Sequence, residues 1–175
     1  ILGFLFSMQG NANEALASCL KAVSIAPQRE YCWISLAQSL EGFSFTSTNG
    51  DIYGCLLQLL KRNTACRPSR MVGAIISALS HLSSYSIIFN QTNSTSLNKD
   101  FSYDDAYIRL ANIPLFLEII KLTPIADFKI EKMLTVLRKG LLKNITSEDF
   151  DPAAMPFAEA LSLQCFVNEY IYPVS

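Results

Sequence analysis

The feature that most constrains this chain is a helix-pair pattern near its N-terminus that starts again in the same register. The pattern sets small residues and large apolar residues at fixed spacings along the two helices of a pair. The first pair covers residues 2–27, and its pattern positions are Leu2, Gly3, Phe6, Ala15, Cys19, Ala22 and Pro27. Trp33 follows the proline by six residues, and the opening positions then recur at a period of 34 residues as Leu36, Ala37 and Leu40. A single pair cannot bury its own faces, so the rest of the chain must stack against it.

This pattern resembles the tetratricopeptide repeat, a helix-turn-helix unit with that period. Residues 10–13 would form the turn between its two helices. After Leu40 the match ends, because the next small-residue position falls at Asn49, inside the turn-rich stretch 46–50. We therefore expect residues 1–46 to form one complete repeat and a lengthened first helix of a second.

The rest of the chain also carries apolar residues at helical spacing, and no segment alternates apolar and polar residues long enough to predict a strand. Residues 47–89 are expected to form a divergent helical hairpin, in which Asp51 caps the first helix and the second runs from Met71 to about Phe89. Residues 90–101 are polar and are expected to form a mobile loop. The predicted fold class is all-α, a tetratricopeptide-like helical hairpin continued by an irregular helical array or bundle.

Residues 102–175 are expected to form a C-terminal helical region. Its helices are predicted to start at residues that cap a helix or suit its first turn, namely Ser102, Pro114, Asp127 and the Asp151-Pro152 pair. One of these helices has an apolar stripe formed by Ile130, Leu134, Leu137 and Leu141. The face opposite this stripe is basic and is predicted to be solvated; it comprises Lys129, Lys132, Arg138 and Lys139.

The composition argues against two classes of partner. The formal net charge is -1 and the basic residues are dispersed, so we expect no binding to nucleic acid. The apolar runs are far shorter than the roughly 20 residues that a membrane-spanning helix needs, so we expect no membrane segment. The five cysteines are an odd number and form no CxxC pair, which favours reduced thiols in a cytoplasmic protein.

The N-terminal segment, residues 1–6, is apolar but lacks the basic stretch and the cleavage site of a signal peptide. The chain also lacks an initiator methionine. We expect it to be part of a larger protein.

The sequence contains no complete set of catalytic residues. His81 is the single histidine and has no metal-ligand spacing to another residue, so a structural role is favoured. Glycine-rich phosphate loops and the GxSxG motif are absent. The acidic pairs Asp104-Asp105 and Glu148-Asp149 stand where helix starts favour negative charge. We therefore predict no enzyme activity within this chain, no cofactor and no metal.

One polar group near the C-terminus is a weaker candidate for a site. Gln164, Asn168 and Glu169 lie at spacings of four and five residues, so their side chains could converge along one helix. Such residues can also serve to tie the last helix to its neighbour through hydrogen bonds.

Most of the chain, taken in order, resembles bacterial proteins in which tetratricopeptide repeats precede a helical connecting region and a C-terminal S-adenosylmethionine-dependent methyltransferase domain. The residues that carry the resemblance are 2–27, 33–46, 122–127, Leu134, Leu137, Arg138 and the Gln-Cys-Phe-Val-Asn-Glu-Tyr run at 164–170. The resemblance implies that the methyltransferase domain would follow Ser175, so it assigns no activity to this chain. By analogy with tetratricopeptide proteins, a partner-binding groove would be lined by Phe4, Ser7, Met8, Tyr31, Ile34, Gln38 and Glu41.

Three hypotheses for function follow. The first is a helical region that recognises a protein or peptide partner, or positions the substrate of a neighbouring catalytic domain, without catalysis of its own. The second is a small helical enzyme or ligand-binding domain with a polar site near Asn168 and Glu169, converging on His81 or Arg109. The third is a homo-oligomeric module that associates through exposed helical ends such as residues 1–6.

Overall fold

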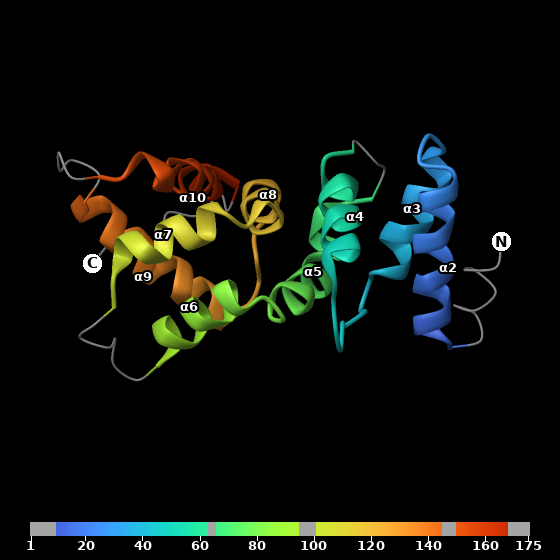
Figure 1. Ribbon diagram of the computed structural model, residues 1–175, viewed down its shortest axis with the longest axis horizontal. Coiled ribbons are helices and arrows are strands. Elements are labelled where there is room, and N and C mark those ends of the chain that lie inside the picture. Colours follow the sequence, from blue (N-terminus) through green and yellow to red (C-terminus); the bar gives the residue numbers. More distant parts are fainter. Residues whose placement is uncertain (1–9, 63–65, 95–100, 145–149, 168–175) are drawn as a thin grey trace. The chain divides into compact units, whose positions relative to one another are not determined.

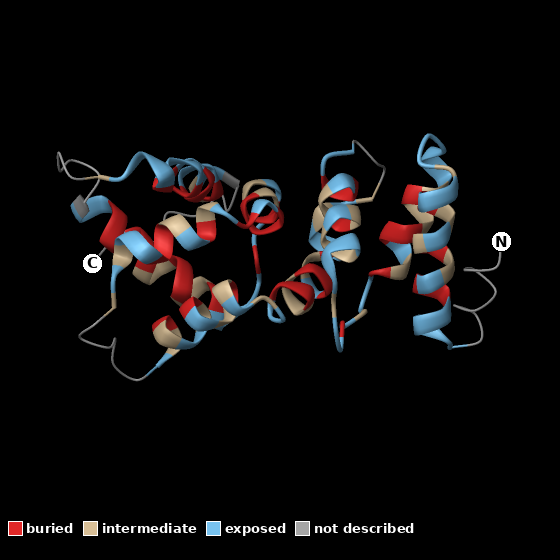
Figure 2. Ribbon diagram, viewed as in Figure 1, coloured by how far each residue is buried: buried red, intermediate tan, exposed pale blue. Residues whose placement is uncertain are grey.

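A computed structural model describes residues 10–62, 66–94, 101–144 and 150–167 (Figure 1). All regular elements within these ranges are helical, which confirms the all-α class. The chain divides into two compact units, unit 1 (Ile1–Ala78) and unit 2 (Leu79–Ser175). Each unit buries its own set of apolar side chains (Figure 2).

Unit 1 starts with two helices that pack against each other, α2 (Ala12–Ile25) and α3 (Glu30–Ser39). Gly10 has a φ of 78°, a backbone conformation that glycine adopts without steric cost, and it turns the chain into α2. The shared core consists of Ala15, Leu16, Cys19 and Val23 from α2 and Trp33, Leu36 and Ala37 from α3. The predicted hairpin positions within the described residues are therefore buried, except Ala22, which is half-buried, and Pro27, which is exposed.

Trp33 links the turn between these helices to the core. Its side chain is 2% exposed, and its indole Nε1 donates a hydrogen bond of 2.8 Å to the carbonyl oxygen of Pro27. A buried indole N–H needs such a partner. The guanidinium of Arg62 lies 4.2 Å from the centre of the indole rings, a cation–π contact that covers the ring.

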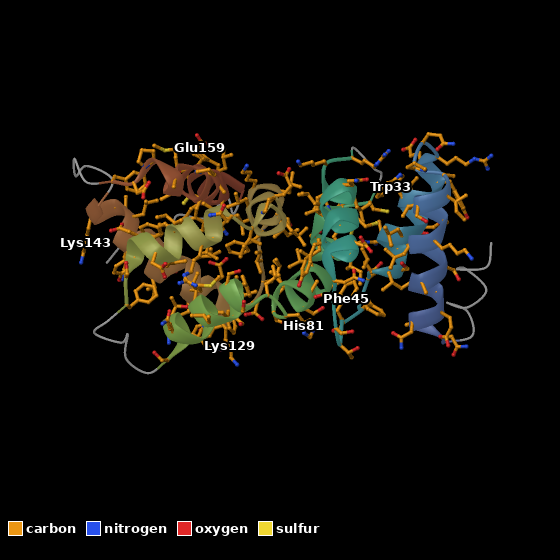
Figure 3. All side chains as sticks on the ribbon, in the orientation of Figure 1. Trp33, Phe45, His81, Lys129, Lys143 and Glu159 are labelled. Carbon is orange, nitrogen blue, oxygen red and sulfur yellow. The ribbon has the colours of Figure 1, made fainter. Side chains whose placement is uncertain are left out.

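The predicted lengthening of the helix that contains Trp33 is wrong. α3 ends at Ser39, and Gly42 turns the chain with a φ of 72°. The following segment is held by side chains rather than by helix: the backbone N–H of Phe45 donates to Ser77 Oγ at 2.9 Å, and Phe45 itself is buried (Figure 3). A loop therefore occupies the place where the repeat register fails.

Two further helices complete unit 1, α4 (Gly50–Leu60) and, after a 3-10 turn at Pro68–Arg70, α5 (Val72–Leu79). The cap of α4 is Asn49, whose Oδ1 accepts the N–H of Ile52 at 3.0 Å; the prediction of Asp51 was therefore two residues late, and Asp51 lies in the first turn. Tyr53 joins the two helices, because its hydroxyl donates to the carbonyl of Ala78 at 2.8 Å.

The single helix predicted from Met71 to Phe89 is instead two helices. α5 ends at Leu79, and α6 (Ser83–Asn93) begins after a break that contains Ser80 and His81. Serine side chains compete for backbone hydrogen bonds and favour such interruptions. α6 also continues through Asn93, so residues 90–93 are helical and not part of a loop as predicted; residues 95–100 lie outside the described residues.

Unit 2 continues with α7 (Tyr103–Ala111), α8 (Pro114–Leu122), α9 (Phe128–Asn144), a 3-10 turn at Pro152–Ala154 and α10 (Met155–Val167). The predicted starts are confirmed. Ser102 Oγ accepts from Asp105 N, Asp127 Oδ1 from Ile130 N, and Asp151 Oδ1 from Ala153 N. Pro114 occupies the first turn of α8.

Aromatic rings from four helices form the centre of unit 2. Tyr85 of α6 contacts Phe116 of α8 at a centroid distance of 5.3 Å, and Phe116 contacts Phe157 of α10 at 6.4 Å. Phe157 in turn stacks on Tyr107 of α7 at 5.8 Å. All four side chains are at most 1% exposed, so we call this set the aromatic chain of unit 2.

The described α-helices are between 8 and 17 residues long. Within the described ranges, no single helix is long and apolar enough to span a membrane, and α5 with α6 reaches that length and apolarity only as a pair taken across the break between them.

Candidate binding cleft

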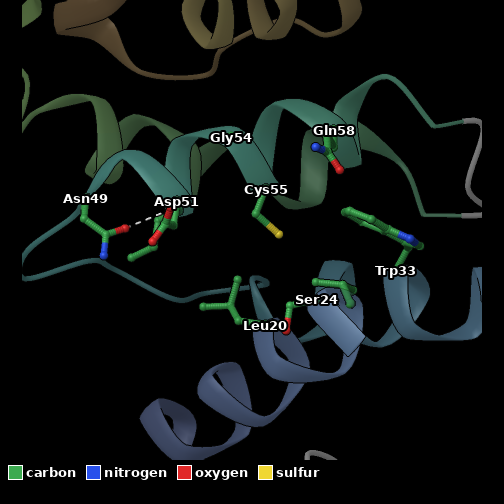
Figure 4. Close-up of a pocket in the computed structure, with 10 residues that line it drawn as sticks. Leu20, Ser24, Trp33, Asn49, Asp51, Gly54, Cys55 and Gln58 are labelled. Carbon is green, nitrogen blue, oxygen red and sulfur yellow. Dashed lines mark hydrogen bonds between the residues drawn. The ribbon is translucent and has the colours of Figure 1, made fainter. Parts of the chain in front are cut away.

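Unit 1 contains an open cleft of about 630 Å³ between α2 and α4 (Figure 4). This volume lies within the range of about 300–1,000 Å³ that is usual for ligand sites. The lining residues come from α2, α3, α4 and the residue that caps α4; they are Leu20, Val23, Ser24, Trp33, Asn49, Asp51, Ile52, Gly54, Cys55 and Gln58.

The apolar part of the lining is contributed by both sides of the cleft. Leu20 and Val23 stand on α2, Ile52 stands on α4, and Trp33 lies at the end of the cleft remote from Asn49. The hydrogen bond of Trp33 to Pro27 and its contact with Arg62 fix the orientation of the indole. The indole of Trp33 therefore has a fixed orientation before any ligand binds.

The α4 side presents a line of residues with helical spacing. Asp51, Gly54, Cys55 and Gln58 stand three or four positions apart, so they share one face of the helix. Gly54 has no heavy atom within 4 Å of where a Cβ would stand, so a side chain at this position would meet open space.

The polar groups of the cleft can hydrogen-bond to a ligand. Ser24 Oγ donates to the carbonyl of Lys21 at 2.8 Å, which leaves its oxygen as an acceptor. Asn49 uses Oδ1 to cap α4, which leaves its amide nitrogen as a donor. Asp51 is exposed, and within the described ranges its carboxylate has neither an ion pair nor a hydrogen bond.

Cys55 points into the cleft toward α2 (Figure 4). Burial raises the pKa of its thiol to about 11. The thiol is therefore protonated at neutral pH, and a protonated thiol is a weak nucleophile. None of the five cysteines forms a disulfide.

The predicted partner-binding residues lie elsewhere. Tyr31, Ile34 and Gln38 share the face of α3 that is turned away from its buried residues, and Glu41 follows the helix end. Tyr31 is 67% exposed, and Glu41 pairs with Arg70 at 3.6 Å. None of these four lines the cleft. The other three predicted residues, Phe4, Ser7 and Met8, lie outside the described residues.

The cleft was not predicted, because its residues on α4 follow neither a repeat register nor a catalytic motif. The signal that could have found it is the sequence Asn49-Gly50-Asp51, a helix start, followed by Cys55 and Gln58 on the same face. No local sequence pattern predicts that this face of α4 lies opposite α2.

The polar group predicted near the C-terminus is tied into the packing of α9 and α10. Gln164 is fully buried; its Oε1 accepts from Arg138 Nη2 at 3.0 Å, and its Nε2 donates to Glu131 Oε1 at 3.4 Å. Asn168 and Glu169 lie outside the described residues. The described part of this group therefore holds two helices together.

Arg109 and His81 are the other residues predicted for this second site. Arg109 pairs with Asp105 on its own helix at 2.6 Å. His81 is exposed in the break between α5 and α6 (Figure 3). Across the part of the chain that the structure describes, no three histidine, cysteine, aspartate or glutamate side chains gather as metal ligands would.

Comparison of the chain with protein-family models, with curated proteins and with solved structures found no match.

Proposed function

We propose that this chain is the helical recognition region of a larger protein, and that the cleft of unit 1 binds a short segment of a partner protein. The observation that carries the proposal is the cleft itself, which combines apolar side chains and polar groups from both α2 and α4 with the indole of Trp33 at one end. This combination is typical of sites that hold a ligand in one orientation.

The chemistry of the lining favours binding over reaction. Its ionisable groups are one carboxylate, Asp51, and one protonated thiol, Cys55. General acid–base or nucleophilic catalysis needs a base within hydrogen-bond reach of the reacting group. The lining pairs no such groups, whereas acceptors and donors beside an apolar wall suit a peptide backbone and its side chains.

The exposed face of α3 belongs to the same proposal as a second contact surface. Tyr31 on this face is 67% exposed, and tyrosine is a common anchor residue in protein interfaces. In the bacterial proteins that the sequence resembles, a region of this kind precedes a methyltransferase domain, and we propose that the bound segment belongs to the substrate or partner of such a domain.

The test is a selection of peptides on the immobilised chain from a random peptide library displayed on phage. The cleft is then filled by Gly54→Leu, where a side chain meets no atom within 4 Å and where leucine also favours helix over glycine by about 1 kcal/mol. Gly73→Leu is the matched control, because Gly73 is an exposed helical glycine of the same unit with equally open surroundings that does not line the cleft.

We expect selected peptides to lose at least tenfold in affinity for Gly54→Leu and to keep their affinity for Gly73→Leu. The triple variant Tyr31→Ala, Gln38→Ala, Glu41→Ala measures the contribution of the α3 face in the same assay. If no peptide is selected, or if Gly54→Leu binds every selected peptide as tightly as the original chain, the cleft is not the recognition site.

A further inference from the structure

We infer that the segment bound in the cleft presents a lysine or arginine side chain, because a single unpaired carboxylate, Asp51, shares the cleft with the apolar side chains of Leu20, Val23 and Ile52. This inference rests on the proposed function and adds the chemistry of the partner.

The charges of the lining have one sign. Among the described residues that line the cleft, Asp51 is the only charged one, and none is lysine or arginine. The guanidinium of Arg62 is stacked on the Trp33 indole, at the opposite end of the cleft from Asp51. A basic group arriving at the Asp51 end therefore meets a carboxylate, whereas an acidic group meets a like charge.

The start of α4 does not reverse this preference. Helix N-termini attract anions through their unpaired N–H groups. Here Asn49 Oδ1 accepts the N–H of Ile52, the carbonyl of Asn49 accepts the N–H of Tyr53, and the carboxylate of Asp51 stands in the first turn. The protein thus supplies its own anion at this position, and a second anion would have to displace it.

The apolar lining selects the shape of the cation. Lysine and arginine carry three or four methylene groups that pack along apolar surface while the charged end reaches a polar partner. Leu20 and Val23 from α2 and Ile52 from α4 offer such a surface beside Asp51. The Gln58 amide and the Ser24 hydroxyl stand along the same cleft, where a peptide backbone would find partners (Figure 4).

Trp33 makes the binding directly measurable, because it is the only tryptophan of the chain and it lines the cleft. The experiment titrates the complete chain with two peptides of equal size, acetyl-leucyl-lysyl-leucinamide and acetyl-leucyl-glutamyl-leucinamide. Trp33 emission gives the affinity, and isothermal calorimetry repeats it without the reporter. We expect the lysyl peptide to bind at least tenfold more tightly at low salt, with the difference shrinking as salt is added.

The matched variants are Asp51→Asn and Asp104→Asn. Both aspartates are exposed and occupy the second position of a helix, in α4 and α7, so both changes remove the same charge from the same helical context. Only Asp51 lines the cleft. We expect Asp51→Asn to reduce the preference for the lysyl peptide to less than threefold, and Asp104→Asn to leave it unchanged.

Equal or tighter binding of the glutamyl peptide overturns the inference, and so does a lysyl preference that survives Asp51→Asn. Absence of binding by both peptides overturns it as well. The proposed function is judged separately by the Gly54→Leu selection: peptides that depend on the open cleft but lack basic residues would leave the function standing and remove only the cationic partner.

Discussion

Two buried tyrosines of unit 2 differ by one hydrogen bond. The hydroxyl of Tyr107 donates to the carbonyl of Leu137 at 3.1 Å, whereas the buried hydroxyl of Tyr85 has no hydrogen-bond partner among the described residues. Leaving a polar group unpaired in a core costs about 1–3 kcal/mol. Burial raises the pKa of both hydroxyls, and Asp127 adds to the increase at Tyr85.

We therefore expect Tyr85→Phe to keep or raise the free energy of unfolding at neutral pH, by up to about 1 kcal/mol, and Tyr107→Phe to lower it by about 0.5–1.5 kcal/mol. Urea denaturation followed by circular dichroism measures both. A loss for Tyr85→Phe as large as that for Tyr107→Phe would mean that the Tyr85 hydroxyl has a partner.

The same tyrosine also gives a pH dependence. Because burial raises the folded-state pKa of Tyr85 above its ordinary value of 10, its titration leaves the free energy of unfolding unchanged below pH 10, where the hydroxyl is protonated in both states. Above pH 10 the hydroxyl ionises in the unfolded chain first, so the free energy of unfolding falls as the pH rises further. Tyr85→Phe should then gain on the original chain by about 1.4 kcal/mol for each pH unit above 10. Tyr107 still titrates in this variant, so the free energy of unfolding of Tyr85→Phe also falls above pH 10, but by less.

At the scale of helices, the crossing of α7 and α9 depends on a missing side chain. A Cβ at Gly140 would overlap the ring of Tyr103 and the hydroxyl of Tyr107, far inside van der Waals contact. Gly140 is buried, and the aromatic residues that crowd it are held in turn by contact with each other and with Phe157. The two helices approach closely because this position has no side chain.

Gly140→Ala is accordingly expected to destabilise unit 2 by about 1–3 kcal/mol, although alanine favours a helix over glycine by about 1 kcal/mol. Gly73→Ala provides the comparison, since it offers the same helical gain where no atom stands within 4 Å. Chemical denaturation should show that the free energy of unfolding falls for Gly140→Ala and rises for Gly73→Ala. A gain in stability for Gly140→Ala would show that α7 can move aside without cost.

Helix starts in unit 2 could be predicted from the sequence because capping is local: Ser102, Asp127 and Asp151 hydrogen-bond to N–H groups two or three residues ahead. The predicted solvated basic face failed at Arg138, which is 8% exposed. Its burial depends on Gln164, 26 residues away on α10, and no local pattern reports such a partner. The cleft escaped prediction for the same reason, since its two sides belong to helices that are distant in the sequence.

At the scale of the whole molecule, the two units have separate cores and separate reporters. Trp33, the only tryptophan, lies in unit 1, while the aromatic chain of four rings lies in unit 2. Compact units with their own cores can unfold as separate cooperative bodies. Tryptophan emission should then follow unit 1 alone, and circular dichroism should follow both units.

This separation predicts that Gly140→Ala shifts the circular dichroism curve to lower denaturant while the midpoint of Trp33 emission stays where it was. Gly54→Leu should raise the denaturant midpoint of Trp33 emission, because leucine favours the helix of unit 1 more than glycine does. Equal shifts of both probes in either variant would show that the chain unfolds as one body.

The aromatic chain has a consequence for how relatives of this protein vary. Tyr85, Phe116, Phe157 and Tyr107 come from four helices, and each ring fills the space that the next one leaves. A smaller side chain at one of these positions leaves a void that its neighbour can fill only by becoming larger. Side-chain volumes at these four positions should therefore change in compensating pairs among homologous sequences, with Phe116 and Phe157, the two inner rings, changing least often alone.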